Sequence, residues 1–248
     1  MNVTFLGTGA AWPAPDRVQT GILLEDTTPI LLDCGSGILH TLSSTTVGVT
    51  GIEHLLITHH HPDHVSDIIG LLVARWLAGA PPLSITGPAG TREFIHDMIK
   101  LYPDFSDDLN PDVTDIDPGE HTISDYSITA VPTSHSIDCL AYRIETPACC
   151  LTYSGDTEPR PEIAALADGS TVLIHDCSFP DDIDVGNHST PTALGNILAG
   201  TEIGRVYLTH LYPHTDGRHQ ELIDAVNSHY DGDVQIAHDG LSVNVTRL

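Results

Sequence analysis

The sequence predicts an α/β protein in which two mixed β-sheets face each other and helices cover both outer faces, a four-layer αββα sandwich. Three observations predict this class. The chain begins with several short strand-like runs, later apolar runs each end in a residue suited to chemistry, and helical patterns fall between those runs. At 248 residues and 40% hydrophobic content, the chain (residues 1–248) is expected to form a single domain with one sizeable core.

The strand predictions follow from short runs of apolar and β-branched residues. Three runs near the start are expected to be strands, at Val3–Leu6, Gly21–Leu24 and Ile30–Leu32. Four later runs, at 55–58, 151–153, 172–174 and 206–209, lead into histidine or into Ser-Gly-Asp. Such runs are typical of buried strands, which deliver functional residues at their carboxyl ends in open α/β sheets.

Helical patterns occupy the segments between these strands. They are expected at about Ser66–Gly79, Gly90–Leu101, Arg160–Ala167, Thr190–Ile203 and Gly217–Tyr230. Ser189 or Thr190 followed by Pro191 is typical of a helix start, because the hydroxyl caps the first turn and proline suits its first position. The aspartate-rich stretch from Asp104 to Asp117 is predicted to be a surface loop.

Composition restricts the classes of function. The formal net charge of −25 indicates either a salt-adapted organism, because molar salt shortens the Debye length to about 3 Å, or a surface that repels nucleic acid at low ionic strength. Five cysteines without repeated spacing are expected to be reduced thiols. No run approaches the roughly 18 apolar residues of a membrane span, so we expect a cytoplasmic protein without membrane contact.

The clearest chemical signal is the run Thr58-His59-His60-His61-Pro62-Asp63-His64. Imidazole nitrogen and carboxylate oxygen are ligands that zinc and similar dications prefer. A tight turn after a strand can direct His59 and His61 to one ion while Asp63 and His64 reach a second. An exposed histidine run without a metal is the alternative, which the internal position and the interposed proline and aspartate disfavour.

This HxHxDH signature after a strand resembles the metallo-β-lactamase superfamily, and within it the short ribonuclease Z-like branch. The resemblance extends over nearly the whole chain. Three further motifs carry it, namely Phe5-Leu6-Gly7-Thr8-Gly9 with Pro13 and Arg17, Leu32-Asp33-Cys34-Gly35-Ser36-Gly37, and Tyr153-Ser154-Gly155-Asp156-Thr157. The resemblance implies the metallo-β-lactamase fold, which is the four-layer sandwich expected above, and a homodimer.

The resemblance also implies a complete ligand set for two divalent ions. His59, His61 and His135 would hold one ion, Asp63, His64 and His210 the other, and Asp156 would bridge both. A bridging carboxylate offsets the repulsion between dications roughly 3.5–4 Å apart. Zinc is the expected metal, with manganese or iron as alternatives, because such donor sets accept several metals.

Metal-bound water with a pKa of about 7 supplies the nucleophile in sites of this type, which leaves protonation of the leaving group to a side chain. His188 resembles the branch's general acid, and Asp176 resembles the acidic residue that would orient it and raise its pKa. Asp63 is a further candidate for proton transfer. The alternative for the segment around His188 is simple helix capping.

Two departures from the ribonuclease Z pattern affect the expected substrate. In the tRNA-processing members, a serine and an arginine that clamp phosphate follow the last histidine ligand, whereas here Leu211-Tyr212-Pro213-His214 follow His210, and a histidine only partly replaces a guanidinium. The segment between His64 and His135 is also too short for a basic arm of the kind that binds tRNA, and its only cations are Arg75, Arg92 and Lys100.

We therefore expect a dinuclear metal-dependent phosphodiesterase that acts on single-stranded RNA or small nucleotides. One alternative is a carbonyl-directed hydrolase of the same superfamily, such as a lactonase or thioesterase. The other is a catalytically silent metal-bearing binding protein.

Overall fold

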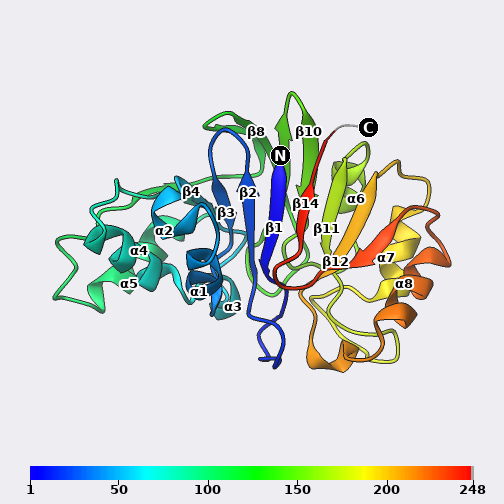
Figure 1. Cartoon of the computed structure of the whole chain (residues 1–248). Coiled ribbons are helices and arrows are strands. Elements are labelled where there is room, and N and C mark those ends of the chain that lie inside the picture. Colours follow the sequence, from blue (N-terminus) through cyan, green and yellow to red (C-terminus); the bar gives the residue numbers. More distant parts are fainter. Residues whose placement is uncertain (247–248) are drawn as a thin grey trace.

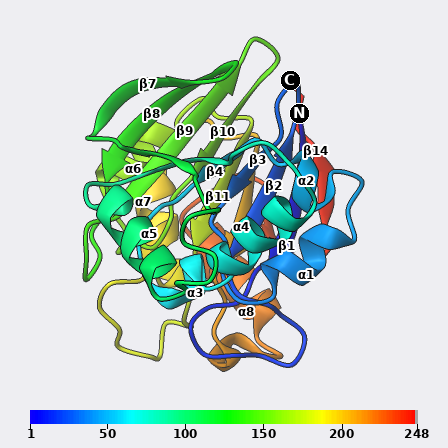
Figure 2. The same ribbon diagram turned by 90° about the vertical axis from the view of Figure 1, so that its left-hand side faces the viewer.

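Two seven-stranded sheets face each other in the computed structural model, which describes residues 1–246 (Figure 1). Helices α1–α5 cover the outer face of one sheet, and α6–α8 cover the outer face of the other (Figures 1 and 2). This is the four-layer αββα sandwich that the sequence predicts. No helix within residues 1–246 combines the length and apolar character needed to cross a bilayer.

The first sheet contains the amino-terminal strands and has the order β14-β1-β2-β3-β4-β5-β6. Neighbours from β14 to β3 are antiparallel, and β3 to β6 are parallel. Its strands are β1 (Asn2–Gly7), β2 (Gly21–Glu25), β3 (Ile30–Leu32), β4 (His54–Leu56), β5 (Ser84–Gly87), β6 (Asp112–Asp115) and β14 (Ser242–Asn244).

The second sheet has the order β13-β12-β11-β10-β9-β8-β7. Its first four members run parallel, and β7 to β10 form an antiparallel meander. Its strands are β7 (Gly119–Ile123), β8 (Tyr126–Pro132), β9 (Leu140–Thr146), β10 (Cys149–Tyr153), β11 (Val172–Asp176), β12 (Arg205–Thr209) and β13 (Val234–Ile236).

The helices connect the parallel strands, because strands that run in the same direction need a long crossover connection. They are α1 (Ile38–Ser43), α2 (Gly48–Gly51), α3 (Pro62–Val65), α4 (Ile68–Leu77), α5 (Thr91–Lys100), α6 (Pro161–Ala167), α7 (Pro191–Leu198) and α8 (His219–Asn227), with a short 3-10 turn at Pro213–Thr215. Pro62, Pro161 and Pro191 each occupy a first-turn position, where the missing amide hydrogen costs nothing.

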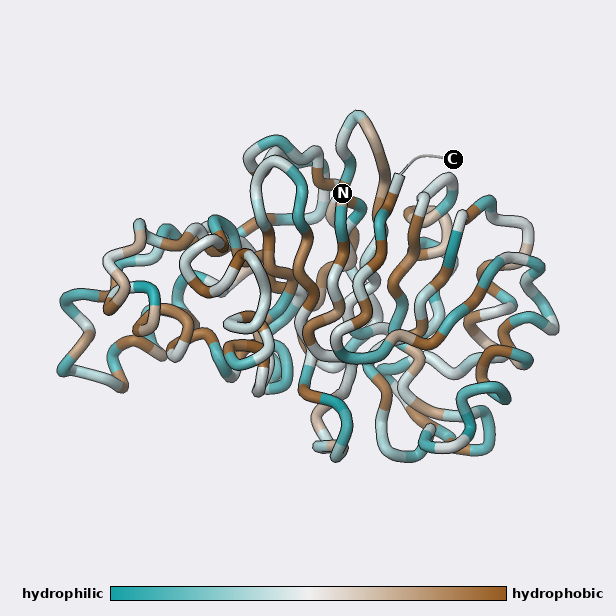
Figure 3. Tube along the Cα trace, viewed as in Figure 1, coloured by the Kyte–Doolittle hydropathy of each residue, from teal (hydrophilic) through white to brown (hydrophobic). Residues whose placement is uncertain are grey.

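Three apolar layers hold the sandwich together. The layer between the sheets contains the buried rings of Phe5, Tyr142 and Tyr153. One further apolar cluster lies between each sheet and the helices that cover it. Figure 3 shows hydrophobic residues concentrated along the central strands. Because β4, β8, β10 and β12 all end at one edge of the sandwich, the residues that follow them can meet there.

One local expectation was wrong in detail. The Asp104–Asp117 stretch is not loop throughout, because Asp112–Asp115 forms edge strand β6 beside β5. An edge strand needs only backbone pairing on one side, so its acidic side chains can point to solvent. The helix expected at about Ser66–Gly79 is α4 (Ile68–Leu77), and a separate short helix, α3, begins before it at Pro62 within the histidine run.

Candidate metal centre

The structure brings all seven sequence-predicted metal ligands together at one edge of the sandwich. One group comes from the turn after β4 and from α3, and the other comes from loops that follow β8, β10 and β12 in the second sheet. The seven residues are His59, His61, Asp63, His64, His135, Asp156 and His210. Both sheets therefore contribute to the same centre.

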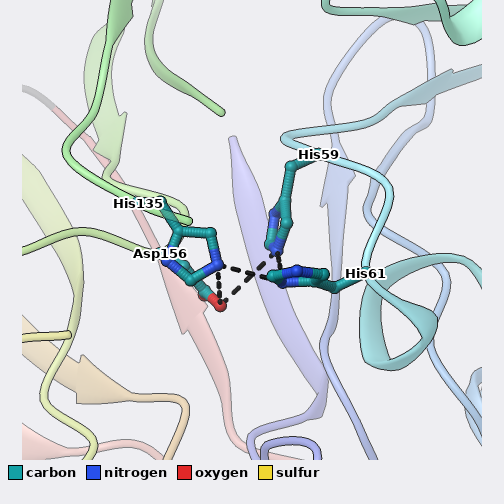
Figure 4. A group of neighbouring side chains, drawn as sticks. All are labelled: His59, His61, His135 and Asp156. Carbon is teal, nitrogen blue, oxygen red and sulfur yellow. Dashed lines mark hydrogen bonds and ion pairs between the residues drawn. The ribbon is translucent and has the colours of Figure 1, made fainter. Parts of the chain in front are cut away.

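The first cluster consists of His59, His61, His135 and Asp156, whose side chains converge in Figure 4. Nδ1 of His61 lies 3.0 Å from Nε2 of His59 and 3.0 Å from Nε2 of His135. Oδ2 of Asp156 lies 3.6 Å and 3.8 Å from those same Nε2 atoms of His59 and His135. Donors about 2.1 Å from a common ion in a tetrahedron lie roughly 3.4 Å from one another, so this cluster fits a zinc-sized ion.

The second cluster consists of Asp63, His64, His210 and the same Asp156. Nε2 of His210 lies 3.3 Å from Nε2 of His64 and 3.1 Å from Oδ2 of Asp63. Oδ1 of Asp156 lies 3.3 Å from Nε2 of His64, whereas Oδ2 of Asp156 faces the first cluster and lies 3.3 Å from Nε2 of His210. One carboxylate thus belongs to both clusters, as a bridging ligand requires.

Four of the histidines have an outer ring nitrogen bonded to the surrounding protein. The acceptors at Asp33 and at the Asn187 carbonyl fix those two outer nitrogens as donors, so each inner nitrogen can offer a lone pair to the centre once it carries no proton. The bonds run from His59 to the Thr58 hydroxyl (3.0 Å), from His64 to the Asp33 carboxylate (2.8 Å), from His135 to the Asn187 carbonyl (2.9 Å) and from His210 to the Ser178 hydroxyl (2.9 Å). Converging lone pairs of this kind suit a cation.

Buried negative charge supports the same conclusion. Asp33, Asp63 and Asp156 are nearly inaccessible to solvent, and within residues 1–246 their ion pairs are with histidine only. Burial opposes ionisation, yet His210, His64 and His59 hold the pKa of Asp156 well below its usual range. Burying a charged carboxylate without a lysine or arginine partner costs free energy. Divalent cations bound at the centre would neutralise this negative charge.

Backbone conformation at the centre is unusual. Within residues 1–246, four residues other than glycine have positive φ, and three of these belong to the site: Asp33 (57°), Asn187 (69°) and His210 (59°). This left-handed region disfavours most side chains, and such strain is concentrated at functional sites where surrounding contacts maintain it. Ser178 contributes here, because its hydroxyl also lies 2.9 Å from the carbonyl oxygen of His210.

His188 and Asp176 lie beside the second cluster. Nδ1 of His188 donates to Oδ2 of Asp176 over 2.9 Å, and the two rings of His188 and His210 stack with centroids 5.2 Å apart. Burial lowers the pKa of His188, but the Asp176 carboxylate outweighs it and raises that pKa to about 9. His188 is therefore protonated at neutral pH in the metal-free protein.

Asp176 is better suited to orienting neighbours than to binding metal, although it also lies within a third group of metal-type side chains with Asp156, His188 and His210. Its Oδ1 accepts from the Ser178 hydroxyl at 2.6 Å. Its Oδ2 accepts from the Thr157 amide at 3.2 Å as well as from His188. These three bonds already use most of the roughly four lone-pair positions of the carboxylate.

Three residues that sequence reasoning did not select support the ligands from outside. Asp33 accepts from Thr58, His64 and the Tyr153 hydroxyl, and Thr58 and Ser178 contact the outer faces of His59 and His210. Asp33 stands in a motif that carried the family resemblance, but only as part of a turn. Thr58 and Ser178 have no spacing signal, since their role depends on contacts between segments.

Comparison with known proteins agrees with this geometry. The family model described as "Beta-lactamase superfamily domain" matches residues 28–211. A ribonuclease Z of Mycolicibacterium paratuberculosis is 30% identical over 244 residues, covering 86% of each chain, and a ribonuclease BN of Enterobacter is 27% identical, covering 88% of this chain and 91% of its own.

Solved structures share the fold along the whole chain. The metallo-beta-lactamase fold protein YhfI from Bacillus subtilis superposes with a TM-score of 0.87 at 24% identity and 98% coverage of both chains. The short form of human tRNase Z superposes with a TM-score of 0.81 at 23% identity and 99% coverage of both chains.

Proposed function

Because this chain belongs to the beta-lactamase superfamily, and within it to the relatives of ribonuclease Z, we propose that it is a dinuclear metal-dependent phosphodiesterase of RNA or small nucleotides. The observation that carries this proposal is the Asp156 carboxylate, which is shared by both donor clusters. When bound, two divalent cations supply Lewis acidity that lowers the pKa of water to about 7 and withdraws charge from a phosphoryl group.

The protein's own residues would then position and protonate the substrate. His59, His61 and His135 would hold one cation, Asp63, His64 and His210 the other, and Asp156 both. His188, oriented by Asp176, would donate a proton to the leaving oxygen, and its raised pKa keeps that proton available near neutrality. Asp63, which contacts His210, is a second candidate for moving a proton during turnover.

The surroundings of the centre favour a short substrate over a folded tRNA. β6 and β7 are separated only by residues 116–118, so no extended arm leaves the body at that point. After His210, the residues at the usual phosphate clamp are Tyr212 and His214 rather than a serine and an arginine. We therefore propose single-stranded RNA ends or small nucleotide phosphodiesters as the substrate class.

Four further properties are proposals at the same level. Zinc is the proposed metal, because the donor spacings suit tetrahedral sites, with manganese or iron as alternatives. A homodimer and a cytoplasmic location are proposed from the relationship to ribonuclease Z. Adaptation to high salt is proposed from the net charge of −25.

A substrate panel tests the proposed reaction. The protein loaded with zinc or manganese is incubated, at low and molar salt, with 5′- and 3′-labelled RNAs, 2′,3′-cyclic nucleotides, bis-p-nitrophenyl phosphate, lactones and thioesters. We expect cleavage of phosphodiesters and loss of that activity in Asp156→Asn. Hydrolysis of only the lactones or thioesters would instead assign carbonyl chemistry, and two bound metals without any turnover would indicate a binding protein.

A further inference from the structure

A row of aromatic side chains leads from the proposed general acid to the surface. We call Phe179, Tyr212, His214 and Trp12 the aromatic row. The Tyr212 ring stacks on Phe179 with centroids 4.5 Å apart and lies 5.9 Å from the His188 ring. The His214 ring lies 5.3 Å from Phe179 and 5.7 Å from Trp12, which it meets edge to face. The inner end of the row therefore adjoins the candidate active site.

The fold sets this row by pairing two segments that are distant in sequence. Gly9, just after β1, forms a parallel bridge with Leu211, just after His210, and the Leu211 amide donates to the Thr8 carbonyl. Trp12 follows Gly9 by three residues, and His214 follows Leu211 by three residues. The two segments run in the same direction from this bridge, so the rings of Trp12 and His214 lie next to each other.

Exposure increases along the row. Phe179 is buried at 9% exposure and supports the row from below, whereas Trp12 is 60% exposed. Trp12 lies in an exposed loop of alanine and proline residues, between Ala11 and Pro13, where it contributes little to a core. Its exposed ring faces are available for contact with a planar group.

The charges around the row exclude recognition by a cationic clamp. The guanidinium of Arg17 is buried and bonds to the Thr8 hydroxyl and the Ala237 carbonyl. The guanidinium of Arg218 is occupied by Asp182 and Glu221. Within residues 1–246, we find no other arginine or lysine in the loops that carry the row (residues 8–20, 177–190 and 210–218), which instead contain several aspartates.

We propose that the aromatic row binds the heterocyclic base of a nucleotide whose phosphodiester lies at the metal centre. This deepens the proposed function and rests on it for the position of the phosphate. Stacking is tolerant of sequence and is effective without positive charge, because every base has an aromatic face. The row would thus supply, through base stacking, the substrate affinity that a phosphate clamp supplies elsewhere.

A binding experiment tests the base contact without requiring turnover. In the metal-loaded Trp76→Phe variant, Trp12 is the one remaining tryptophan, since the chain has two. We expect adenosine 5′-monophosphate to quench its fluorescence and ribose 5-phosphate to leave the fluorescence unchanged. His214→Ala in this background should weaken the nucleotide's affinity about tenfold, as loss of one stacking contact does. Equal binding of the two ligands would overturn the proposal.

A kinetic experiment tests the same contact during the reaction. The p-nitrophenyl ester of thymidine 5′-monophosphate carries a base, whereas methyl p-nitrophenyl phosphate does not, and both release the same leaving group. Trp12→Leu should lower kcat/KM for the nucleoside ester about tenfold and leave the methyl ester unchanged. Trp76→Leu is the matched control, because Trp76 packs on Phe105 in the distant α4 region and should alter neither substrate.

The outcomes separate this proposal from the proposed function. If the wild-type protein cleaves neither ester but distinguishes the nucleotide from ribose 5-phosphate, the phosphodiesterase proposal fails and the base contact stands. If Trp12→Leu lowers both kcat/KM values equally or lowers neither, the row does not bind the base.

Discussion

Four of the five candidate histidine ligands are held by two different kinds of contact. The inner nitrogen faces the other candidate ligands, while the outer nitrogen hydrogen-bonds with the Thr58 hydroxyl, the Asp33 carboxylate, the Asn187 carbonyl or the Ser178 hydroxyl. Such outer bonds fix the ring orientation and tautomer, and their loss typically weakens metal binding. Metal binding should therefore depend on the residues that hydrogen-bond the outer nitrogens as well as on the candidate ligands themselves.

Asp33→Asn should weaken metal binding about 10- to 100-fold while retaining the fold. Asparagine tolerates the positive φ at this position but does not provide the carboxylate that His64 and Thr58 contact. Competition with a chromophoric chelator measures the affinity. The exposed Asp26→Asn variant is the control, and an affinity equal to that of the wild type would show that Asp33 does not position His64.

His188→Ala should lower turnover about 100-fold or more, the range of general acid catalysis, with metal content unchanged. The cause would be loss of the proton donor that Asp176 orients. Steady-state rates and elemental analysis measure the two effects, with His229→Ala at an exposed site as the control. Undiminished turnover would remove His188 from the mechanism.

Metal binding should release a proton and become tighter as pH rises. Burial opposes protonation of His64, but Asp156 and Asp33 raise its pKa well above the usual value, so the metal-free protein carries this proton at neutral pH. The raised pKa of His64 stabilises the metal-free fold at low pH, and this contribution is lost as pH rises through the pKa of the folded state. A metal ion binds only the deprotonated ring, so it competes with this proton.

The affinity for the metal should therefore increase by about tenfold per pH unit in the range below the pKa of His64, where binding displaces one proton. Calorimetry in two buffers of different ionisation enthalpy measures the proton released. Metal binding at pH 7 without proton release would contradict the assignment.

At the scale of elements, short helices begin and end through side chains supplied by neighbouring segments. Helix α1 begins after Gly37 without a side-chain cap of its own, and Asp67 from the segment between α3 and α4 accepts from the amides of Gly37 and Leu39, each over 2.9 Å. This contact joins the first helix of the outer layer to the segment that carries Asp63 and His64.

Asp67→Ala should lower the free energy of unfolding of the metal-free protein by about 1–2 kcal/mol, because it leaves two helix-terminal amides without an acceptor. Urea denaturation measures this change. Ser43→Ala, which removes only an exposed hydroxyl bond to the carbonyl of His40, should change it by less than about 0.5 kcal/mol. Equal effects of the two substitutions would show that Asp67 does not stabilise α1.

At the scale of the whole molecule, the centre joins the two halves of the sandwich. His59, His61, Asp63 and His64 come from the first sheet's side, and His135, Asp156 and His210 come from the second sheet. Cations bound there would hold the two halves together and would offset buried negative charge. A binding site of this kind adds to global stability, because ligands that bind only the folded state shift the unfolding equilibrium.

Chelation should therefore lower the melting temperature by about 10 °C, which corresponds to about 4 kcal/mol for metal at a thousand times its dissociation constant. Differential scanning calorimetry with and without chelator measures the shift. The Asp156→Asn variant should show a much smaller shift, since it lacks the shared carboxylate. If the chelator lowered the melting temperature of this variant as much as that of the wild type, the stabilising metal would bind elsewhere.

The amino-acid sequence alone determined the layers and the ligand types. Strand and helix periods and the histidine run depend on local spacing, so they predicted the fold class and the candidate ligands His59, His61, Asp63 and His64. The candidates His135, Asp156 and His210 came from the resemblance to the ribonuclease Z-like branch. Several strands were not predicted, and β6 is one of them, because Asp112–Asp115 pairs through its backbone rather than through an apolar pattern.

Only the tertiary structure decided how these residues act on one another. The contact of Asp33 with His64, the Ser178 link between Asp176 and His210, and the meeting of Trp12 with His214 join segments far apart in the chain. Hydrogen bonds and ring contacts depend on distances of a few ångströms between such segments. Sequence spacing does not contain those distances, because they arise only when the two sheets pack and their strand ends meet.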